Sequence, residues 1–501
     1  MSSLAGRLLG HAARASGSVA LIDGGRRMSY EELATRASAL AAGLRGFGVR
    51  AGDRVVGVLA HGADAVVAMY GSWFAGAVYV PVNVQARGPE IANVVRHSGA
   101  RVLLHEPMRP ELPVAEAGAT GAHVQASTVP DLCDDASVIT RTPDAGAGAG
   151  AVAMLLYTSG TTGRPKAVTL TAGNLDANVA SIIQYLGLSN TDKVLSVLPL
   201  HYSYGNSVLH THLAAGGTVV FERNLVFPHA MVETMAKEGV TGFSGVPSTF
   251  ALLLSRVNLA ASGLEALRYV TQAGAAMSPA MVARLRRALP GVKVFVMYGQ
   301  TEATARLAYV PPDRLDEKVG SAGIAIPGVE LQIRDEAGAA LGPDVVGEVW
   351  ARGANVMHGY WNDEEATRAV LRDGWLRTGD LGRMDRDGFL FLSGRRSDMI
   401  KTGANRVHPQ EIEEVLEGLP GLREAAVAGI DDELLGQAVA AYVVPEPDSG
   451  LTIERIKAHC LEQLAPYKVP KHVFFLKALP RTASGKLQRF ELEAATREES
   501  K

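Results

Sequence analysis

Residues 53–83 read DRVVGVLAHGADAVVAMYGSWFAGAVYVPVN. The apolar run at 53–60 predicts a strand, and residues 66–83 predict a helix followed by a short strand that ends at Pro81. A further apolar run, ARVLLHE, occupies residues 100–106 and predicts another strand. Strands that alternate with helices form parallel sheets covered on both faces, so the fold class is α/β.

The same alternation extends in both directions from this stretch. Upstream, residues 28–47 carry apolar positions at helical spacing after a possible Ser29 cap. Downstream, strands and helices alternate to about residue 300, and the pattern becomes strand-rich from about 320. After Gly394 two helical and two strand patterns form a compact α+β unit. We therefore expect a large domain at 1–394 and a small domain at 395–501.

Composition narrows the class of protein further. Of 501 residues, 47% are hydrophobic and 20% charged, which is globular composition and excludes disorder along most of the chain. A net charge of −3 argues against general nucleic-acid binding. Cys133 and Cys460 provide no disulfide framework, and no apolar run is long enough to span a membrane. These features predict a cytoplasmic protein.

The stretch LLYTSGTTGRPKAV at 155–168 carries the first chemical signal. It is an apolar strand followed by glycines, hydroxyls and a lysine. Glycines let main-chain N–H groups face an anion, while hydroxyl and ammonium groups add donors and charge. The spacing differs from the Walker motif because Arg164-Pro165-Lys166 follows Gly163. A triphosphate loop is favoured over a solvated turn between a strand and the next element.

This run resembles the phosphate loop of the adenylate-forming superfamily, which includes acyl- and aryl-CoA ligases, peptide-synthetase adenylation domains and firefly luciferase. The remaining family motifs follow in order over essentially the whole chain. The resemblance implies a large N-terminal domain of mixed sheets and helices with a distorted β-barrel, and a small α+β C-terminal domain that rotates. It also implies ATP and Mg²⁺. The phosphate-loop residues would be Thr158, Ser159, Gly160, Thr161, Thr162, Gly163 and Lys166.

Two more motifs would complete the nucleotide site of such a protein. YGQTEAT at 298–304 places Tyr298 and Gly299 at the base, Thr301 at the phosphates and Glu302 on Mg²⁺, which prefers oxygen ligands. On its own Glu302 could be a carboxylate at a helix start. QAGAA at 272–276 would approach the adenine through Gly274 and Ala275. A tight turn without a role in binding is equally compatible with this sequence.

The C-terminal motifs supply groups for the ribose and for catalysis. Asp380 in GWLRTGDLG and Arg395 in SGRRSDMIK match the residues that hold the ribose, and an Asx turn is the alternative for Asp380. Ser397 stands at the hinge, where many relatives carry Asp or Lys. Lys486 in PRTASGKLQR matches the adenylation lysine, which stabilises charge between the carboxylate and the α-phosphate.

KTGANRVHPQEIEEV at 401–415 resembles the loop that guides a phosphopantetheine arm. Lys401 and Arg406 match positions used in the second half-reaction. Family members often have Gly-Gly where this chain has Gly403-Ala404. A methyl group at Ala404 narrows the thiol tunnel or requires a negative φ.

LPLHYSYGNSVLHTHL at 198–213 matches the segment that enters the acyl pocket. Relatives commonly have aromatic-His in its middle, whereas this chain has His201-Tyr202, so the gating role falls to one of these two. His210 and His212 are two positions apart on an expected helix and should face apart, which argues against a metal pair. Further pocket residues would be Tyr204, Gly205, Phe243, Gly245, Val246, Ala273 and Met297.

The stretch 198–215 contains no acidic residue, so a buried α-ammonium group would lack a partner. We therefore expect a small aliphatic or aromatic acid without an α-amino group. The enzyme would convert it with ATP to acyl-AMP and pyrophosphate and then transfer it to a phosphopantetheine thiol. The acceptor is coenzyme A or a carrier protein, because Lys468, Lys471, Lys477 and Arg481 suit either one.

Three other functions share these motifs. They are an amino-acid adenylation enzyme that loads a carrier protein, a luciferase-like oxygenase and a catalytically silent adenylate-binding protein. The silent protein would need a damaged site, and Lys486, Glu302, Asp380 and Arg395 are all present. A homodimer is expected from the general frequency of such assemblies.

Overall fold

The computed structural model describes residues 3–107, 124–134, 148–158, 166–223, 227–403, 405–432, 434–481, 487–489 and 491–492, without the side chains of Ser397 and Arg406. The chain forms two compact units. The larger comprises 1–315, 325–330 and 351–376, and the smaller comprises 316–324, 331–350 and 377–501. A division into 1–394 and 395–501 remains a prediction.

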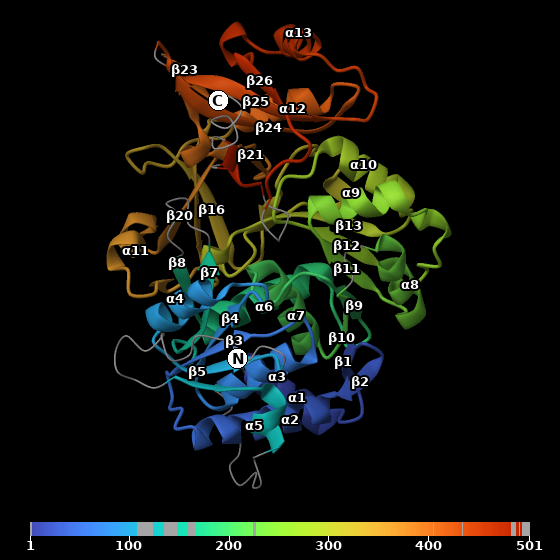
Figure 1. The fold of residues 1–501 in the computed structure, drawn as a ribbon, viewed down its shortest axis with the longest axis vertical. Coiled ribbons are helices and arrows are strands. Elements are labelled where there is room, and N and C mark those ends of the chain that lie inside the picture. Colours follow the sequence, from blue (N-terminus) through green and yellow to red (C-terminus); the bar gives the residue numbers. More distant parts are fainter. Residues whose placement is uncertain are drawn as a thin grey trace. The chain divides into compact units, whose positions relative to one another are not determined.

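Two large sheets build the first unit, as the α/β pattern predicts (Figure 1). The seven-stranded sheet contains, in spatial order, β18 (Gly359–Tyr360), β8 (Lys166–Thr171), β7 (Val152–Thr158), β4 (Val78–Val82), β3 (Arg54–Val58), β5 (Ala100–His105) and β6 (Gln125–Ser127). Strands β3 and β4 are parallel, and the intervening α3 (Ala63–Phe74) is the helix expected from the opening stretch. β4 continues one residue beyond Pro81.

The nine-stranded sheet carries the 198–213, 272–276 and 298–304 motifs at the ends of its strands. Its order is β15 (Ile324–Ala325), β14 (Ala308–Tyr309), β13 (Lys293–Tyr298), β12 (Tyr269–Gln272), β11 (Gly242–Gly245), β9 (Lys193–Ser196), β10 (Thr218–Phe221), β1 (Val19–Asp23) and β2 (Arg26–Ser29). Strands β9 to β13 pair with one another in parallel, whereas β13 and β14 are antiparallel. Parallel strands bring their carboxyl ends to one edge, where ligands bind in open α/β sheets.

Helices cover these sheets (Figure 1). The helix predicted at 28–47 is α2, and the Ser29 hydroxyl caps it by accepting from the Glu32 main-chain N–H at 3.1 Å. The helices before residue 377 are α1 (Leu4–Arg14), α2 (Tyr30–Gly46), α3, α4 (Gly88–Ser98), α5 (Val129–Asp134), α6 (Ala172–Leu186), α7 (Ser203–Ala215), α8 (Pro228–Glu238), α9 (Pro247–Arg256), α10 (Pro279–Ala288) and α11 (Glu364–Val370).

The strand-rich region after residue 320, where the resemblance implies a distorted β-barrel, forms a five-stranded sheet. Its order is β16 (Val329–Arg334), β17 (Gly347–Gly353), β20 (Trp375–Met384) and β19 (Leu371–Arg372), with β21 (Leu390–Arg395) beside β20. The β20–β21 hairpin is the one that its Asp387-Gly388 turn predicts, and the Asp385 carboxylate accepts from the Asp387 main-chain N–H at 3.0 Å.

The remaining sheet has the order β23 (Asn405–Val407), β22 (Ile400–Thr402), β25 (Gly436–Pro445) and β24 (Leu422–Asp432), with β26 (His472–Phe475) beside β25. Helix α12 (Pro409–Glu417) buries Ile412 and Leu416, and α13 (Ile453–Gln463) buries Ile456 and Cys460 in the same core. Each such aliphatic side chain contributes about 1.5–3 kcal/mol. The α+β character predicted for this region is confirmed.

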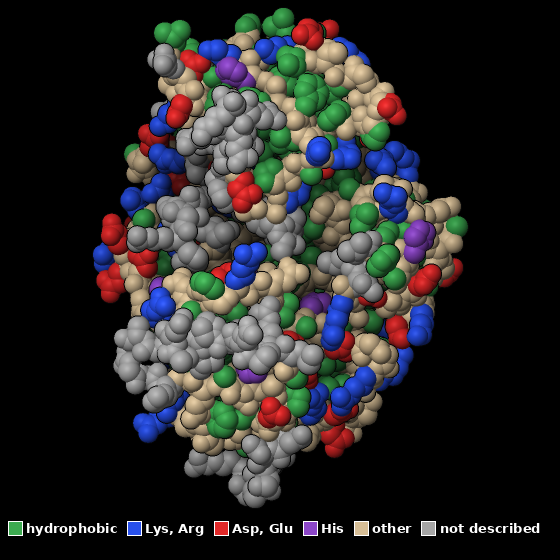
Figure 2. Space-filling view, in the orientation of Figure 1, with side chains coloured by type: hydrophobic (Ala, Val, Ile, Leu, Met, Phe, Trp, Pro, Cys, Tyr) green, Lys and Arg blue, Asp and Glu red, His purple; other side chains and the backbone are tan. Residues whose placement is uncertain are grey.

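Among the helices that the structure describes, none has the length and apolar character to cross a bilayer. On the face drawn in Figure 2, basic and acidic side chains of the described residues are interspersed.

Candidate functional site

The two described ends of the phosphate loop lie side by side. Thr158 ends β7 and Lys166 begins β8, and the two residues are register partners in an antiparallel pair. The Thr158 hydroxyl lies 3.4 Å from the Lys166 carbonyl. Ser159, Gly160, Thr161, Thr162 and Gly163 fall outside the described residues.

Tyr360 connects Lys166 to Glu302. It lies in β18, which pairs with β8 beside Lys166. Its hydroxyl donates to the Glu302 Oε1 atom at 2.9 Å, and the Lys166 Nζ lies 5.0 Å from the centre of its ring. One aromatic side chain therefore orients the predicted metal ligand and contacts the predicted phosphate-binding lysine. A hard carboxylate oxygen fits Mg²⁺, which proteins commonly hold through one or two carboxylates plus substrate phosphates.

The YGQTEAT motif is anchored at the end of β13. A Cβ atom on Gly299 would lie 2.0 Å from the Ala305 carbonyl oxygen, so only glycine fits here. Tyr298 is buried, and Thr301 begins a short 3₁₀ turn, Thr301–Ala303. The Thr301 hydroxyl lies 3.2 Å from the Ser203 hydroxyl, which joins this motif to the start of α7.

The 272–276 stretch forms an exposed turn after β12. Gly274 has φ of +92°, a left-handed conformation that favours glycine. The Gln272 side chain donates to the Ala275 carbonyl at 2.6 Å, which closes the turn. Gly274 and Ala275 are exposed.

His201 and Tyr202 stand just before α7, with ring centres 4.2 Å apart. Burial lowers the pKa of His201 to about 4, so its imidazole is neutral at pH 7. Its Nε2 atom is buried without a hydrogen-bond partner among the described residues. A neutral imidazole with a free ring nitrogen can accept from or donate to a ligand. Both residues remain candidates for the gating role.

The residues predicted for the acyl pocket lie along α7 and the ends of three neighbouring strands. The Tyr204 hydroxyl donates to the Thr271 carbonyl at 2.8 Å, which fixes α7 against β12. Phe243 packs edge-on against Phe250 in the core. The members found at these places are Tyr204 and Gly205 on α7, Phe243 and Gly245 on β11, Val246 and Ala273 just beyond strand ends, and Met297 on β13.

His210 and His212 face apart, as their spacing on a helix predicts. His210 Nδ1 lies 3.1 Å from the Tyr70 hydroxyl. His212 Nε2 lies 2.6 Å from the Tyr269 hydroxyl. Burial lowers the pKa of His210 to about 3 and that of His212 to about 4. Both rings are neutral core residues, and the two do not form a metal pair.

In the second unit, Asp380 and Arg395 are register partners on β20 and β21. The Arg395 Nε lies 3.1 Å from the Asp380 Oδ1 atom. The Thr378 hydroxyl accepts from the Asp380 main-chain N–H at 3.1 Å. A hairpin thus holds the two predicted ribose-binding side chains together.

The predicted thiol-tunnel loop forms the β22–β23 hairpin, in which Lys401 pairs with Arg406. The Lys401 main-chain N–H donates to the Gln437 side chain at 2.9 Å, and Gly403 donates to the Leu435 carbonyl at 2.8 Å. Lys401 and Gly403 are exposed. Ala404 and Lys486, like the side chains of Arg406 and Ser397, lie outside the described residues.

Three of the four cations expected to attract a phosphate or an acidic helix already have carboxylate partners. Lys468 pairs with Glu411 and Lys471 pairs with Asp432. Arg481 lies 2.7 Å from Glu424. Because their charges are already compensated, these three side chains would attract a phosphate or an acidic helix less strongly than unpaired cations.

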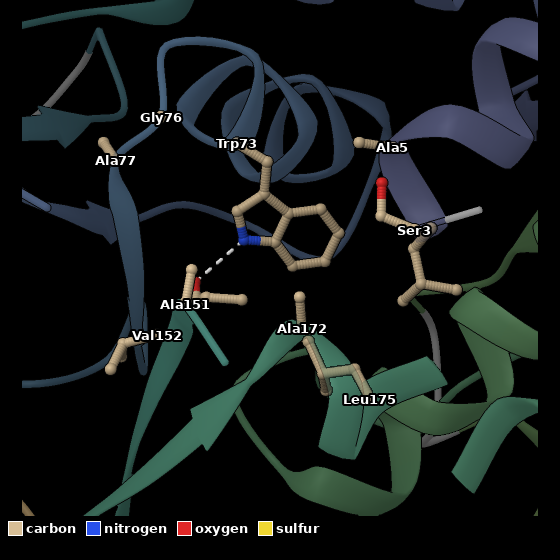
Figure 3. Close-up of a pocket in the computed structure, with 11 residues that line it drawn as sticks. Ser3, Ala5, Trp73, Gly76, Ala77, Ala151, Val152, Ala172 and Leu175 are labelled. Atoms are coloured by element: carbon tan, nitrogen blue, oxygen red, sulfur yellow. Dashed lines mark hydrogen bonds between the residues drawn. The ribbon is translucent and has the colours of Figure 1, made fainter. Parts of the chain in front are cut away.

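A cavity of about 50 Å³ lies apart from these motifs. Trp73 forms one wall, and its indole N–H donates to the Ala153 carbonyl at 2.8 Å (Figure 3). None of the predicted site residues lines this cavity. A second cavity of about 400 Å³ lies beside His11, Tyr30 and Gly216 and is likewise separate.

The sequence interpretation missed Tyr360 and Arg306. Tyr360 occurs in MHGYWN, a short run with no chemical signal of its own. Arg306 is a lone charge in ATARLAYV at 303–310, and a charged residue in an apolar run is the signal that could have identified it. Its guanidinium carbon lies 4.1 Å from the centre of the Tyr204 ring.

Comparison with known families gives the same assignment as the motifs. The model of the AMP-binding enzyme family matches residues 9–361, and that of the AMP-binding enzyme C-terminal domain matches residues 411–486. The chain therefore belongs to the AMP-binding enzyme family, which is the adenylate-forming superfamily that its motifs resemble.

Similar curated proteins include a feruloyl-CoA synthase from Amycolatopsis, 35% identical over 94% of both chains. An indoleacetate–CoA ligase from Aromatoleum aromaticum is 33% identical over 96% of this chain and 95% of the relative. These relatives are acid–CoA ligases, so the prediction of an AMP-forming acid–thiol ligase is confirmed at the level of class.

Solved structures agree over nearly the full length. ATP-bound MatB from Rhodopseudomonas palustris has a TM-score of 0.92 at 29% identity and covers both chains completely. The o-succinylbenzoate CoA synthetase from Bacillus subtilis, in complex with ATP and magnesium, has a TM-score of 0.86 at 31% identity and covers 97% of this chain and 99% of its own. The predicted α/β fold class is confirmed, and these two neighbours bind the ATP, or the ATP and magnesium, that the motifs predict for this chain.

Proposed function

We propose that this chain activates a carboxylic acid without an α-amino group as its acyl-AMP and transfers the acyl group to the thiol of coenzyme A. The observation that carries the proposal is the contact chain from Lys166 through Tyr360 to Glu302, together with the contact between Thr301 and Ser203. It brings cationic, carboxylate and hydroxyl groups, which would hold a metal–phosphate complex, to the start of α7, where the acyl pocket is predicted.

In the first step, an oxygen of the acid's carboxylate attacks the α-phosphorus of ATP. A P–O bond forms, the bond to the β-phosphate oxygen breaks, and pyrophosphate leaves. Lys166, Thr158 and Thr301 would hold phosphate oxygens, and Glu302 would hold Mg²⁺, which supplies charge neutralisation on the phosphates when bound. Lys486 would stabilise the charge at the reacting centre, and Asp380 with Arg395 would hold the ribose.

In the second step, the thiol sulfur attacks the acyl carbon and AMP leaves. Lys401, Gly403, Ala404 and Arg406 would guide the pantetheine arm after a rotation of the small domain about Ser397, a motion that a few hinge residues can absorb. CoA is favoured over a carrier protein because the curated relatives named above are CoA ligases.

The walls of the predicted acyl pocket support an aromatic or aliphatic acid. Phe243, Ala273 and Met297 are buried and apolar, and a neutral His201 offers an α-ammonium group no counter-charge. The relatives named for ferulate and indoleacetate act on acids that carry an aromatic ring.

A cytoplasmic location and a homodimer are also part of this proposal, and sedimentation velocity tests whether the protein is a homodimer.

The test is acid-dependent ATP–pyrophosphate exchange over a panel of aliphatic, aromatic and amino acids. We expect exchange with acids that lack an α-amino group, a large loss in Glu302→Gln and a larger one in Lys486→Ala. Best exchange with α-amino acids would contradict the proposed acid class. Retained ATP binding with no exchange for any acid would indicate a silent adenylate-binding protein. Thioester formation with CoA and with a holo-carrier protein then identifies the acceptor.

A further inference from the structure

A buried arginine stands beside the predicted acyl pocket without a counter-ion. Arg306 is 2% exposed, and its Nε atom has no hydrogen-bond partner among the described residues. Its Nη1 atom makes one long contact, 3.4 Å from the Ala305 carbonyl. Within the described part of the chain, no carboxylate forms an ion pair with it.

The groups around this guanidinium are aromatic and uncharged. Its carbon stacks on the Tyr204 ring at 4.1 Å. It also lies near the Tyr185 hydroxyl, where burial raises the Tyr185 pKa to about 12 and the arginine opposes that rise. Burial likewise raises the pKa of Tyr204. Both phenols stay protonated at neutral pH and provide no negative charge.

Such an arrangement is costly for the protein alone. An arginine does not lose its proton in proteins, and it carries five N–H donors in a planar fork. Buried charges are normally paired, because an uncompensated buried charge is strongly unfavourable. The described neighbours of Arg306 leave much of this donor capacity unused. An anion that binds together with the substrate would compensate this charge.

The main chain holds Arg306 next to predicted site residues. The Leu307 N–H donates to the Tyr298 carbonyl at 2.8 Å, and the Asn355 side chain donates to the Arg306 carbonyl at 2.9 Å. Tyr204 follows Ser203, the first residue of α7. The Tyr185 hydroxyl donates to the Met297 sulfur at 3.2 Å, so both aromatic neighbours of Arg306 also touch or belong to the acyl-pocket set.

We propose that Arg306 binds a second carboxylate at the far end of the acid, so that the substrate of this enzyme is a dicarboxylic acid activated at one of its two carboxylates. This inference rests on the proposed function and narrows its substrate class. The planar fork of a guanidinium matches a carboxylate through two parallel hydrogen bonds. The same positive charge repels an α-ammonium group, in agreement with the absence of acidic residues at 198–215.

The test compares dicarboxylic acids from succinate to suberate, and terephthalate, with monocarboxylic acids from butyrate to octanoate, and 4-methylbenzoate. In wild-type enzyme we expect kcat/KM for the best dicarboxylic acid to exceed that of its matched monocarboxylic acid by about 100-fold or more, because a buried cation left unpaired is heavily penalised. Arg306→Met should abolish this preference, mainly through KM for the dicarboxylic acid. Arg306→Lys should retain part of it. Arg368→Met, which alters an exposed arginine, is the control.

Thermal unfolding separates this role from a structural one. Because Arg306 has no counter-ion to lose, Arg306→Met should have a Tm equal to or above that of wild type. A saturating dicarboxylic acid should raise the Tm of wild type and not that of the variant.

The inference is overturned if wild type prefers monocarboxylic acids, or if Arg306→Met loses stability and keeps the substrate preference. Those outcomes still include exchange and leave the proposed function intact. Absence of exchange with every acid would instead remove the proposed function, and this inference with it.

Discussion

The Tyr360 hydroxyl donates a 2.9 Å hydrogen bond to the Glu302 carboxylate while the Tyr360 ring lies under the Lys166 ammonium group. The hydrogen bond restricts the rotamers of the carboxylate, and the ring offers its negative face to the lysine. Tyr360 is therefore a positioning residue for two groups that come from different motifs.

Tyr360→Phe separates these two contributions. It removes the hydrogen bond and keeps the ring, so the Mg²⁺ concentration for half-maximal exchange should rise by about 10-fold, as expected for one hydrogen bond to a charged group. KM for ATP at saturating Mg²⁺ should change little. Tyr360→Leu also removes the ring and should raise both quantities. An unchanged Mg²⁺ dependence in Tyr360→Phe, with Glu302→Gln impaired, would show that Glu302 orients without the tyrosine.

Gly299→Ala tests the close approach at the end of β13. The added methyl group would lie 2.0 Å from the Ala305 carbonyl oxygen, and main-chain atoms cannot move aside cheaply. We expect a loss of about 1–3 kcal/mol in the free energy of unfolding and a matching loss of ATP affinity, measured by denaturation and calorimetry. Gly46→Ala is the control, because nothing lies within 4 Å of its Cβ position. Equal stability of the two variants would contradict this packing.

The difference between what the sequence predicts and what it leaves open follows from the range of the interactions. Local signals were sufficient for α2, whose Ser29 cap contacts Glu32 only three residues away, and for the Asp387-Gly388 hairpin. The phosphate-loop and YGQTEAT motifs predicted Lys166 and Glu302 as site residues, and the fold connects these two residues through Tyr360. Periodicity and motif letters, however, carry no information about which distant side chain meets another.

The roles of Tyr360 and Arg306 depend on such distant partners. Tyr360 acquires a role only because β18 pairs with β8, and this pairing joins segments far apart in the chain. Arg306 is a candidate because no carboxylate among the described residues forms an ion pair with it. The sequence does not show that a counter-ion is missing. The lone charge in an apolar run indicates where to look, and only the fold shows that it stays unpaired.

Asp176 should make stability depend on pH in a defined direction. This carboxyl group on α6 is 8% exposed, and burial raises its pKa from 3.8 to about 6, against opposing effects of Arg7 and of the Leu4 main-chain N–H. The folded state therefore binds this proton more tightly than the unfolded state does. The contribution of Asp176 to the free energy of unfolding should rise as the pH falls from about 7 to about 4, by at most about 3 kcal/mol.

Asp176→Asn removes that titration and keeps an oxygen that can accept from Leu4. Chemical denaturation near pH 7 and near pH 4.5 should show the variant at least as stable as wild type at the higher pH, with a smaller change between the two. Asp64→Asn, at a half-exposed carboxylate on α3, should retain the wild-type difference. A variant less stable than wild type at pH 7 would mean that the ionised carboxylate and Arg7 stabilise α1.

The Asp380–Arg395 pair gives a prediction about the ribose. Asp380 is 7% exposed, and the Arg395 Nε holds its Oδ1 atom at 3.1 Å, so the carboxylate is fixed before a nucleotide arrives. If it accepts from the ribose hydroxyls, wild type should bind 2′-deoxy-ATP about 10-fold more weakly than ATP, as expected for a charged hydrogen bond. Asp380→Ala should bind both nucleotides equally weakly, and Glu336→Ala, at an exposed carboxylate of the same unit, should behave like wild type. Calorimetry without an acid measures nucleotide binding alone, separate from acyl transfer. If Asp380→Ala still discriminates between the two nucleotides, another group binds the 2′-hydroxyl and the aspartate serves only to orient Arg395.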